Sequence, residues 1–272
     1  MSSVIFDCRT DQGTKSSGNP AEIFANWQGE NERWLFMSPH DDDIVCGCGL
    51  TFISAIQIGV KTFAGVVTNG KMGYCHEEQK ETISQIRQEE CIESFKAMGL
   101  PKENLYFLGF DDGDLNRQAG RRFASSTAVG PILAGAVGLQ NSIVWLLRII
   151  RPTRVFVPSL TDLHPDHKFT NSETVMSIYH AQGNIWPELG EPIPEIPALY
   201  EYATYSNFIT PPTHRIRVSE DLFERKINSI LAYRSQEQIE LTVQIQRNTG
   251  CKEFIREMRF DLFDPDESNK LF

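Results

Sequence analysis

Short apolar runs alternate with amphipathic segments along the first two thirds of the chain. The apolar runs are bounded by polar or glycine-containing turns and predict strands over 34–37, 62–68, 104–110 and 154–158. Apolar or small residues three or four apart predict helices over 44–58, 82–98 and 141–151. Strands that alternate with helices indicate an α/β fold, with a parallel sheet and right-handed crossovers.

The remainder of the chain is less regular. Its periodicity predicts helices over 169–180 and 220–233, and strands over 199–205 and 215–218. The polar stretch 8–20 is expected to be a loose arm, and no pattern assigns 115–140. We therefore expect a single domain over 1–272, with a flanking arm at 1–30 and a C-terminal extension at 240–272.

Composition excludes several classes of protein. With 272 residues, of which 40% are hydrophobic, the chain can bury one sizeable core. A net charge of −10 argues against nucleic acid or an anionic membrane as the main partner. No apolar run approaches the roughly 18 residues that span a bilayer, and the first residues show no signal-peptide pattern. The 6 cysteines lack disulfide or zinc-knuckle spacing, so we expect a cytoplasmic protein.

The candidate chemistry begins directly after the first strand. His40 is followed by the carboxylates Asp41, Asp42 and Asp43, and then by a glycine-punctuated apolar helix. This order puts the polar side chains at the carboxyl end of a strand, where open α/β sheets bind ligands. A histidine nitrogen with carboxylate oxygens suits zinc or another divalent ion. The alternatives are an exposed acidic turn, or Asp43 acting as the N-cap of the helix.

A second polar cluster, His164-Pro165-Asp166-His167, follows the fourth predicted strand. Both clusters therefore lie at strand ends of one predicted sheet, and together they supply three histidines and several carboxylates. A catalytic zinc site typically has three protein ligands and an open position for water. The two clusters could supply such a set.

At these motifs the chain resembles the LmbE-like, or PIG-L, family of zinc-dependent N-deacetylases. The stretch 40–44, with the glycines at 47 and 49, resembles the family's His-Pro-Asp-Asp-Glu motif and helix start, and 164–167 matches its His-Pro-Asp-His motif fully. Further segments resemble family motifs in the same order, at 68–70, 87–99, 107–113 and 226–236. The resemblance implies a Rossmann-like three-layer sandwich, with a mostly parallel sheet and helices on both faces.

The resemblance also implies a function. Family members remove the acetyl group from N-acetylglucosamine-type sugars or glycoconjugates, so a small N-acetyl sugar is the expected partner, and a homo-oligomer stays open. By resemblance, His40, Asp43 and His167 would hold the metal, which is zinc or another divalent ion such as Fe²⁺. Asp42, next to a ligand, would take a proton from the attacking water as general base.

The remaining family roles fall on four residues. A protonated His164, oriented by Asp166, would stabilise the oxyanion and help to protonate the departing amine. Arg87 and Asp112 would bind the sugar. The structural alternatives are that Arg87 pairs with Glu90 on an exposed helix face, and that Asp112 is an ordinary turn residue.

Two residues depart from the family pattern. Asp41 stands where proline is usual, and Ile44 stands where glutamate is frequent. A shifted register would make Asp41 the base and Asp42 a ligand, but the distance from His40 to the following glycines favours the unshifted one. The departures leave a non-catalytic metal- or sugar-binding protein as the alternative, although binding alone would not require Asp42 and His164. A dinucleotide-dependent oxidoreductase is disfavoured, because no Gly-x-Gly-x-x-Gly follows the first strand.

Overall fold

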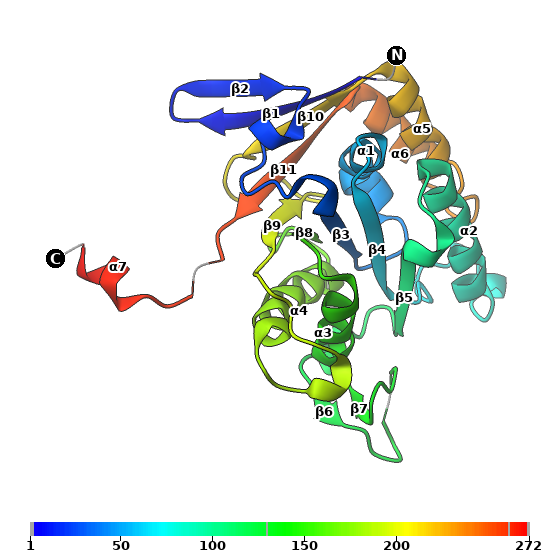
Figure 1. Cartoon of the computed structure of the whole chain (residues 1–272). Coiled ribbons are helices and arrows are strands. Elements are labelled where there is room, and N and C mark those ends of the chain that lie inside the picture. Colours follow the sequence, from blue (N-terminus) through cyan, green and yellow to red (C-terminus); the bar gives the residue numbers. More distant parts are fainter. Residues whose placement is uncertain (1–2, 129, 261, 271–272) are drawn as a thin grey trace.

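The structure is a computed structural model that describes residues 3–128, 130–260 and 262–270. A nine-stranded sheet runs through the molecule (Figure 1). In spatial order its strands are β2 (Gly13–Ser17), β1 (Val4–Thr10), β10 (His214–Val218), β11 (Lys252–Met258), β9 (Ala198–Tyr202), β8 (Arg154–Pro158), β3 (Arg33–Ser38), β4 (Lys61–Thr68) and β5 (Leu105–Phe110). A second, two-stranded sheet joins β6 (Arg122–Phe123) to β7 (Ala136–Val137).

The large sheet has two halves that differ in strand direction. From β5 to β9 all neighbouring strands pair parallel, and from β9 to β2 all pair antiparallel. The α/β class is confirmed, but the prediction of a mostly parallel sheet is wrong, because the sheet is mixed. Between β1 and β2 the cause is local, since a two-residue connection can join only antiparallel strands.

The stretch 8–20, predicted to be a loose arm, contributes instead to the antiparallel half of the sheet. β1 buries Val4 and Phe6 in the core, whereas β2 is exposed along almost its whole length. The sequence of β2, Gly-Thr-Lys-Ser-Ser, contains no large apolar residue. The hydrophobic pattern therefore carried no signal for this strand, which is held by its pairing with β1.

Helices cover both faces of the sheet (Figure 1). One face carries α1 (Asp43–Gln57), α2 (Ile83–Met98) and α5 (Glu220–Ile230), with α6 (Ile239–Thr249) beside α5. The other face carries α3 (Leu139–Ile150) and α4 (Pro165–Gln182), and α7 (Pro265–Asn269) lies near the C-terminus. Among the described helices, none combines the length and apolar character needed to cross a membrane.

The central strand β3 shows how the sequence divides the core into two layers. Its residues are all but fully buried after Arg33, so both faces of the strand must be covered. Trp34 and Phe36 pack toward α1 and α2, while Leu35 and Met37 pack toward α3 and α4. Burial of each such side chain stabilises the fold by roughly 1.5–3 kcal/mol. This core fixes the position at which the chain leaves β3.

The order of the parallel strands fixes where a ligand can bind. The parallel half of the sheet begins with β3, continues outward through β4 to β5, and then returns to the other side of β3 as β8 and β9. The loops that follow β3 and β8 therefore diverge at a topological switch point, where open α/β sheets form a crevice. Both histidine–aspartate clusters lie at this point.

Two further predictions can be compared with the structure. The helix predicted at 169–180 begins earlier, at Pro165, so the second cluster lies in the first turn of α4. The unassigned stretch 115–140 includes the small sheet of β6 and β7. Residues 1–2, 129, 261 and 271–272, which fall in the predicted arm, the unassigned stretch and the C-terminal extension, lie outside the described residues. The single-domain organisation stays a prediction.

Candidate active site

The loop between β3 and α1 brings His40 and Asp43 together. The backbone N–H of His40 donates to Asp43 Oδ2 at 2.8 Å, and His40 Nδ1 lies 3.1 Å from the same oxygen. Asp42 is the N-cap residue and Asp43 is the first residue of α1, so the interpretation of Asp43 as N-cap is wrong. The interpretation as an exposed turn is also wrong, because Asp41 and Asp43 are buried.

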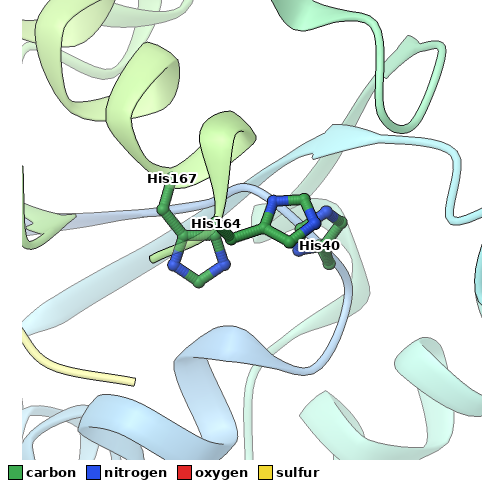
Figure 2. A group of neighbouring side chains, drawn as sticks. All are labelled: His40, His164 and His167. Atoms are coloured by element: carbon green, nitrogen blue, oxygen red, sulfur yellow. The ribbon is translucent and has the colours of Figure 1, made fainter. Parts of the chain in front are cut away.

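The first turn of α4 brings His167 to the other side of Asp43. Pro165 starts this helix, a position where its missing N–H costs nothing. His167 Nε2 lies 3.1 Å from Asp43 Oδ1, and His167 Nδ1 lies 3.2 Å from Asp162 Oδ2. Figure 2 shows the rings of His40, His164 and His167 gathered at this point. The two sequence clusters therefore meet, as predicted.

The cluster around Asp43 is strongly ionic. Burial alone would raise the pKa of Asp43, but His167 and His40 hold it well below its usual value. Burial likewise opposes protonation of His167, yet Asp43 and Asp162 together raise its pKa to about 9. The negative charge of Asp43 and the positive charge of His167 therefore stabilise each other.

The residues present fit a divalent ion. Asp43 Oδ1 and both ring nitrogens of His167 are buried, yet they make no hydrogen bond of good geometry to any described residue. Buried polar atoms are normally satisfied; Asp162 faces His167 Nδ1 at 3.2 Å, and Asp43 Oδ1 and His167 Nε2 are left for another partner. Two imidazole nitrogens with one carboxylate, open on one side, form a donor set typical of catalytic zinc.

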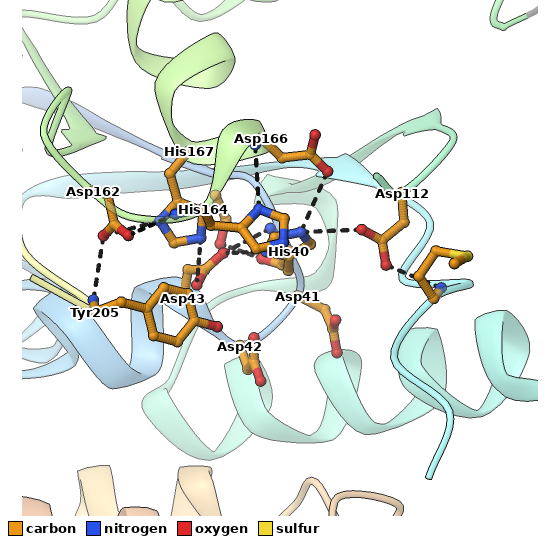
Figure 3. Close-up of polar contacts among 12 residues, drawn as sticks. His40, Asp41, Asp42, Asp43, Asp112, Asp162, His164, Asp166, His167 and Tyr205 are labelled. Atoms are coloured by element: carbon orange, nitrogen blue, oxygen red, sulfur yellow. Dashed lines mark hydrogen bonds and ion pairs between the residues drawn. The ribbon is translucent and has the colours of Figure 1, made fainter. Parts of the chain in front are cut away.

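The distal nitrogen of His40 is also held. Its Nε2 lies 3.1 Å from Asp112 Oδ1 and 3.5 Å from Asp166 Oδ2 (Figure 3). Carboxylates at the far nitrogen of a metal-binding histidine fix the orientation of the ring and raise its basicity. Asp162 stands in the same relation to His167. Two groups of described residues have metal-ligand spacing, namely His40 with His164 and His167, and His40 with Asp112 and Asp166; both contain His40, and neither contains Asp43.

Arg87 lies at the opposite end of the acidic loop. It donates to both oxygens of Asp41 at 2.8 and 2.7 Å, and its Nη2 lies 3.1 Å from Asp42 Oδ2. Arg87 is only 4% exposed. It therefore does not pair with Glu90, whose carboxylate accepts from Ser235 instead. The predicted sugar-binding role of Arg87 stays a prediction, and the geometry favours internal pairing.

Asp42 is the accessible carboxylate of the three. Its side chain is 24% exposed, compared with 5% for Asp41 and 1% for Asp43. It contributes to the wall of a cavity of about 870 Å³, and Asp43 lies on the same wall. A carboxylate that is both open to water and adjacent to a buried histidine–aspartate centre is suited to accept a proton there.

His164 differs from its predicted state. Its Nδ1 accepts a hydrogen bond from the backbone N–H of Asp166 at 3.2 Å, so the ring proton belongs on Nε2. Burial and the neighbouring His40 lower the pKa of His164. Both observations favour a neutral imidazole over the protonated one expected. Orientation by Asp166 comes from its backbone, because its carboxylate accepts from the N–H of Gly113.

Tyr205 is a site residue that the sequence did not point to. Its ring centroid lies 5.2 Å from that of His167 and 6.4 Å from that of His164 (Figure 3). Its backbone N–H donates to Asp162 Oδ2. The charge of Asp43, together with burial, raises the pKa of Tyr205, so the phenol keeps its proton. Tyr205 follows β9, the neighbour of β8, so the strand-end argument could have been extended to it.

A break in α1 explains the late Lys226 motif. Cys48 has non-helical backbone angles, and the carbonyl of Cys46 accepts from Lys226 Nζ at 3.1 Å. Glu253 pairs with Lys226 at 2.8 Å and accepts from the N–H groups after the break. A Cβ on Gly47 would lie 2.7 Å from the ring of Tyr202, so this position requires glycine. The motif therefore shapes the helix that carries Asp43.

The fold and the site together define an α/β protein with a buried histidine–aspartate centre at the switch point of its sheet. The model of the PIG-L family, described as GlcNAc-PI de-N-acetylase, matches residues 35–178, a segment that contains both clusters. The chain therefore belongs to the PIG-L family, as the sequence motifs predicted.

Solved structures give the same fold. N,N′-diacetylchitobiose deacetylase from Pyrococcus horikoshii is 24% identical, with a TM-score of 0.63 and 84% of each chain covered. A conserved protein from Thermus thermophilus is 25% identical, with a TM-score of 0.63 over 85% of this chain and 97% of that one. GalB, the 4-carboxy-2-hydroxymuconate hydratase from Pseudomonas putida, is 17% identical, with a TM-score of 0.62 over 86% and 98%.

Proposed function

We propose that this protein is a metal-dependent hydrolase that removes the acetyl group from an N-acetylglucosamine-type sugar or glycoconjugate. One observation carries the proposal. Asp43 lies between His40 and His167, its buried Oδ1 has no good hydrogen bond to a described residue, and the accessible carboxylate of Asp42 lies beside it on one cavity wall. A metal site alone would not require that second carboxylate.

In the proposal, His40, Asp43 and His167 would hold zinc or another divalent ion. Such an ion would polarise the amide carbonyl and would lower the pKa of bound water from 15.7 to about 7. Asp162 and Asp112 keep the two imidazoles in the tautomers and orientations that binding needs.

Asp42 moves the proton. As water attacks the carbonyl carbon of the acetamide, one water proton passes to a carboxylate oxygen of Asp42, and a C–O bond forms. When the C–N bond then breaks, the protonated Asp42 can return this proton to the departing sugar amine. Arg87 Nη2, at 3.1 Å from Asp42 Oδ2, fixes the orientation of the base. The products are acetate and the free amino sugar.

His164 and Tyr205 stabilise the developing oxyanion as neutral donors. The tautomer of His164 directs an N–H at Nε2, and the phenol of Tyr205 stays protonated. Donors that are already in place when charge develops lower the barrier without reorganisation. This role replaces the imidazolium expected from the sequence.

The substrate class rests on the family and on relatives with sugar substrates. The fold alone does not decide the reaction, since a hydratase shares it. The comparisons give no support to a non-catalytic binding protein. The cytoplasmic location and a homo-oligomer stay predictions.

The test is acetate release from a panel of N-acetylglucosaminides. The protein is assayed as purified, after treatment with a chelator, and after Zn²⁺ or Fe²⁺ is added back. We expect turnover that is lost with chelator and restored by one of the ions. Turnover that survives complete removal of metal would refute metal dependence, and no release from any glycoside would refute the deacetylase.

A further inference from the structure

Helix α1, which carries Asp43 in its first turn, is broken shortly after that turn. Cys48 has φ −145° and ψ 27°, which lie outside the helical region. The part before the break, 43–47, is little more than one helical turn, and a single turn has no stability of its own in water. The position of Asp43 therefore depends on what holds this turn in place.

Two charged side chains from the last third of the chain meet at the break. In a continuous helix the N–H of Leu50 would donate to the carbonyl of Cys46. Here that N–H donates to Glu253 Oε1 at 3.1 Å, and the carbonyl accepts from Lys226 Nζ at 3.1 Å. Lys226 Nζ lies 2.8 Å from the same Glu253 oxygen. The ion pair thus bridges two backbone groups that a continuous helix joins directly, and such insertion is a known cause of helix kinks.

The second carboxylate oxygen of Glu253 holds the part of α1 that continues after the break. Its Oε2 accepts from the backbone N–H and from the hydroxyl of Thr51, both at 2.8 Å. The first N–H groups of a helix lack intrahelical partners, and a carboxylate there is also stabilised by the helix dipole. Glu253, on strand β11, therefore caps the second part of α1.

The ion pair is buried and closely packed. The side chains of Lys226 and Glu253 are 2% and 7% exposed. A Cβ on Gly49 would lie 3.2–3.3 Å from three carbons of the Lys226 side chain, so glycine lets this side chain pass close to the helix backbone. Removal of one charge would leave the other buried without its partner, which destabilises a fold strongly.

Helix α6 supplies a further contact to the turn that carries Asp43. Gln246 Nε2 donates to the carbonyl of Cys46 at 3.1 Å, beside the contact from Lys226. Cys46 follows Asp43 by about one helical turn. The apolar residues of the turn are buried in the core. The core and the contacts at Cys46 together fix the position of Asp43.

We infer that Glu253, through Lys226 and the break in α1, is a positioning residue for Asp43. The inference rests on the proposed function, in which Asp43 holds a divalent ion. Strand β11 lies outside 35–178, the segment that the family model matches. The metal centre thus depends on a strand beyond that segment, although Glu253 forms its hydrogen bonds with Lys226 and with residues after the break.

Zinc affinity in matched variants tests the inference. Glu253→Gln keeps the size of the side chain and removes its charge. The control is Glu32→Gln, because Arg154 and Glu32 form another buried ion pair, at 3.1 Å, at the amino ends of β8 and β3. Metal-free protein is titrated with Zn²⁺ in competition with a chromogenic chelator, and stability is measured by urea unfolding.

We expect both variants to unfold at lower urea concentration than the parent. Only Glu253→Gln is expected to raise the Kd for zinc, by about tenfold, the lower end of the effect of residues that orient metal ligands. The inference is overturned if Glu253→Gln is less stable but keeps the parent Kd, or if the two variants change the Kd equally.

A double variant separates positioning from stability. Lys226→Met with Glu253→Gln leaves no lone buried charge, so it should regain much of the stability that Glu253→Gln loses. The Kd for zinc should stay raised, because methionine cannot donate to the carbonyl of Cys46. Recovery of zinc affinity together with stability would indicate a purely structural role and would overturn the inference.

Gln246→Met is a milder variant that serves if Glu253→Gln does not fold. It removes the second donor to the carbonyl of Cys46 from a half-buried position on α6, and Gln244→Met on the exposed part of α6 is its control. We expect Gln246→Met to raise the Kd for zinc by about threefold, within the range that one hydrogen bond contributes. The same Kd in both variants would contradict the inference.

Hydrogen exchange in the metal-free protein separates this inference from the proposed function. The amide of Cys46 donates to the carbonyl of Asp42 at 3.0 Å, so its exchange reports on the turn itself. We expect faster exchange, by about tenfold, in Glu253→Gln and no change in Glu32→Gln. If the parent binds no zinc, the proposed metal site fails, and this exchange rate still decides the positioning role. Unchanged exchange in Glu253→Gln would overturn that role whatever the parent binds.

Discussion

Asp41 and Asp43 lie two residues apart on one loop, and both are buried, yet their surroundings are opposite. Asp41 accepts from Nε and Nη2 of Arg87 at 2.8 and 2.7 Å, in a buried ion pair. Asp43 lies between two histidines, with one oxygen that makes no good hydrogen bond to a described residue. Asp41 is therefore already paired with a cation, the Arg87 side chain, whereas Asp43 has a free oxygen that a metal ion could occupy.

This contrast shows why a run of identical residues does not share one role. The two carboxylates have the same chemistry, so the difference comes from what other elements bring to them. Helix α2 supplies Arg87 to Asp41, and α4 supplies His167 to Asp43. Asp42, between them, touches Arg87 but stays accessible. Substitutions along the loop and in its partners should therefore differ widely in effect.

The largest effect is expected for His167→Ala, which removes one of the two histidines beside Asp43. Loss of a carboxylate behind a metal-binding histidine typically costs 10–100-fold in affinity or activity, and loss of the ligand itself should cost more. We expect the purified variant to contain almost no metal by elemental analysis and to release no measurable acetate. A full metal equivalent in His167→Ala would contradict the ligand set.

Asp42→Asn should come next. It removes the proton acceptor while preserving shape, and a general base typically contributes 10²–10⁴-fold to the rate. Steady-state acetate release should fall by that order, with metal content unchanged. The control is Asp41→Asn, which changes the same charge one residue away. If Asp41→Asn abolishes turnover while Asp42→Asn spares it, the register of the loop is wrong.

His164→Ala should lower kcat by about 10²–10³-fold, the typical cost of removing one oxyanion donor. Because the site lowers the pKa of His164 below the ordinary value of 6.5, the ring is neutral at pH 7 and above. It should therefore contribute no alkaline limb to the pH–rate profile, and loss of function should appear only as the pH falls through the lowered pKa.

The neutral and cationic roles of His164 can be separated by a matched substitution. His164→Gln keeps a neutral N–H donor but can carry no charge. We expect it to recover a measurable part of the activity that His164→Ala loses, with metal content unchanged in both. Equal loss in the two variants, together with an alkaline limb in the parent alone, would support the imidazolium instead.

The smallest effect is expected at the Asp41–Arg87 pair, where Asp41→Asn should change the free energy of unfolding only slightly. Burial, and then repulsion from Asp42, raise the pKa of Asp41 to about 7 even though Arg87 opposes the shift. The folded protein thus holds this proton more tightly than the unfolded chain, whose carboxyl has a pKa near 3.8. The stability that Asp41 contributes is greatest at low pH and is lost as the pH rises through about 7.

Urea unfolding checks this sign. At pH 8 the loss of charge-assisted hydrogen bonds to Arg87, worth about 1.5–3 kcal/mol, is offset by relief of the buried charge. The free energy of unfolding of Asp41→Asn should then lie within about 2 kcal/mol of the parent at pH 8, and fall further below it at pH 5. A gap that widens toward high pH would contradict the shift.

The sequence was sufficient for the parts of the site that depend on strand ends. A short apolar run places His40 at the end of β3, another places His164 and His167 after β8, and the parallel pairing of β3 with β8 brings them together. The local hydrophobic pattern is enough here, because the carboxyl ends of neighbouring parallel strands lie at the same edge of the sheet.

The parts that escaped prediction depend on long-range polar contacts. The partner of Asp41 is 46 residues away on α2, and the Glu253 carboxylate reaches across 203 residues to α1. Neither contact leaves a periodic trace in the sequence. The strand β2 has no large apolar residue to mark it, and the polar side chains of α6 look like an ordinary solvated helix face, although Thr242 and Gln246 line a cavity together with β11 and the loop after β9.

Metal content in a matched pair of variants tests the central contrast most directly. Asp43→Asn and Asp41→Asn each remove one buried carboxylate charge from the same loop. Elemental analysis after saturation with Zn²⁺ and removal of free ion should give one equivalent for the parent and for Asp41→Asn, and close to none for Asp43→Asn. Equal metal content in the two variants, whether full or absent, would contradict the assignment of the ion to the Asp43 end.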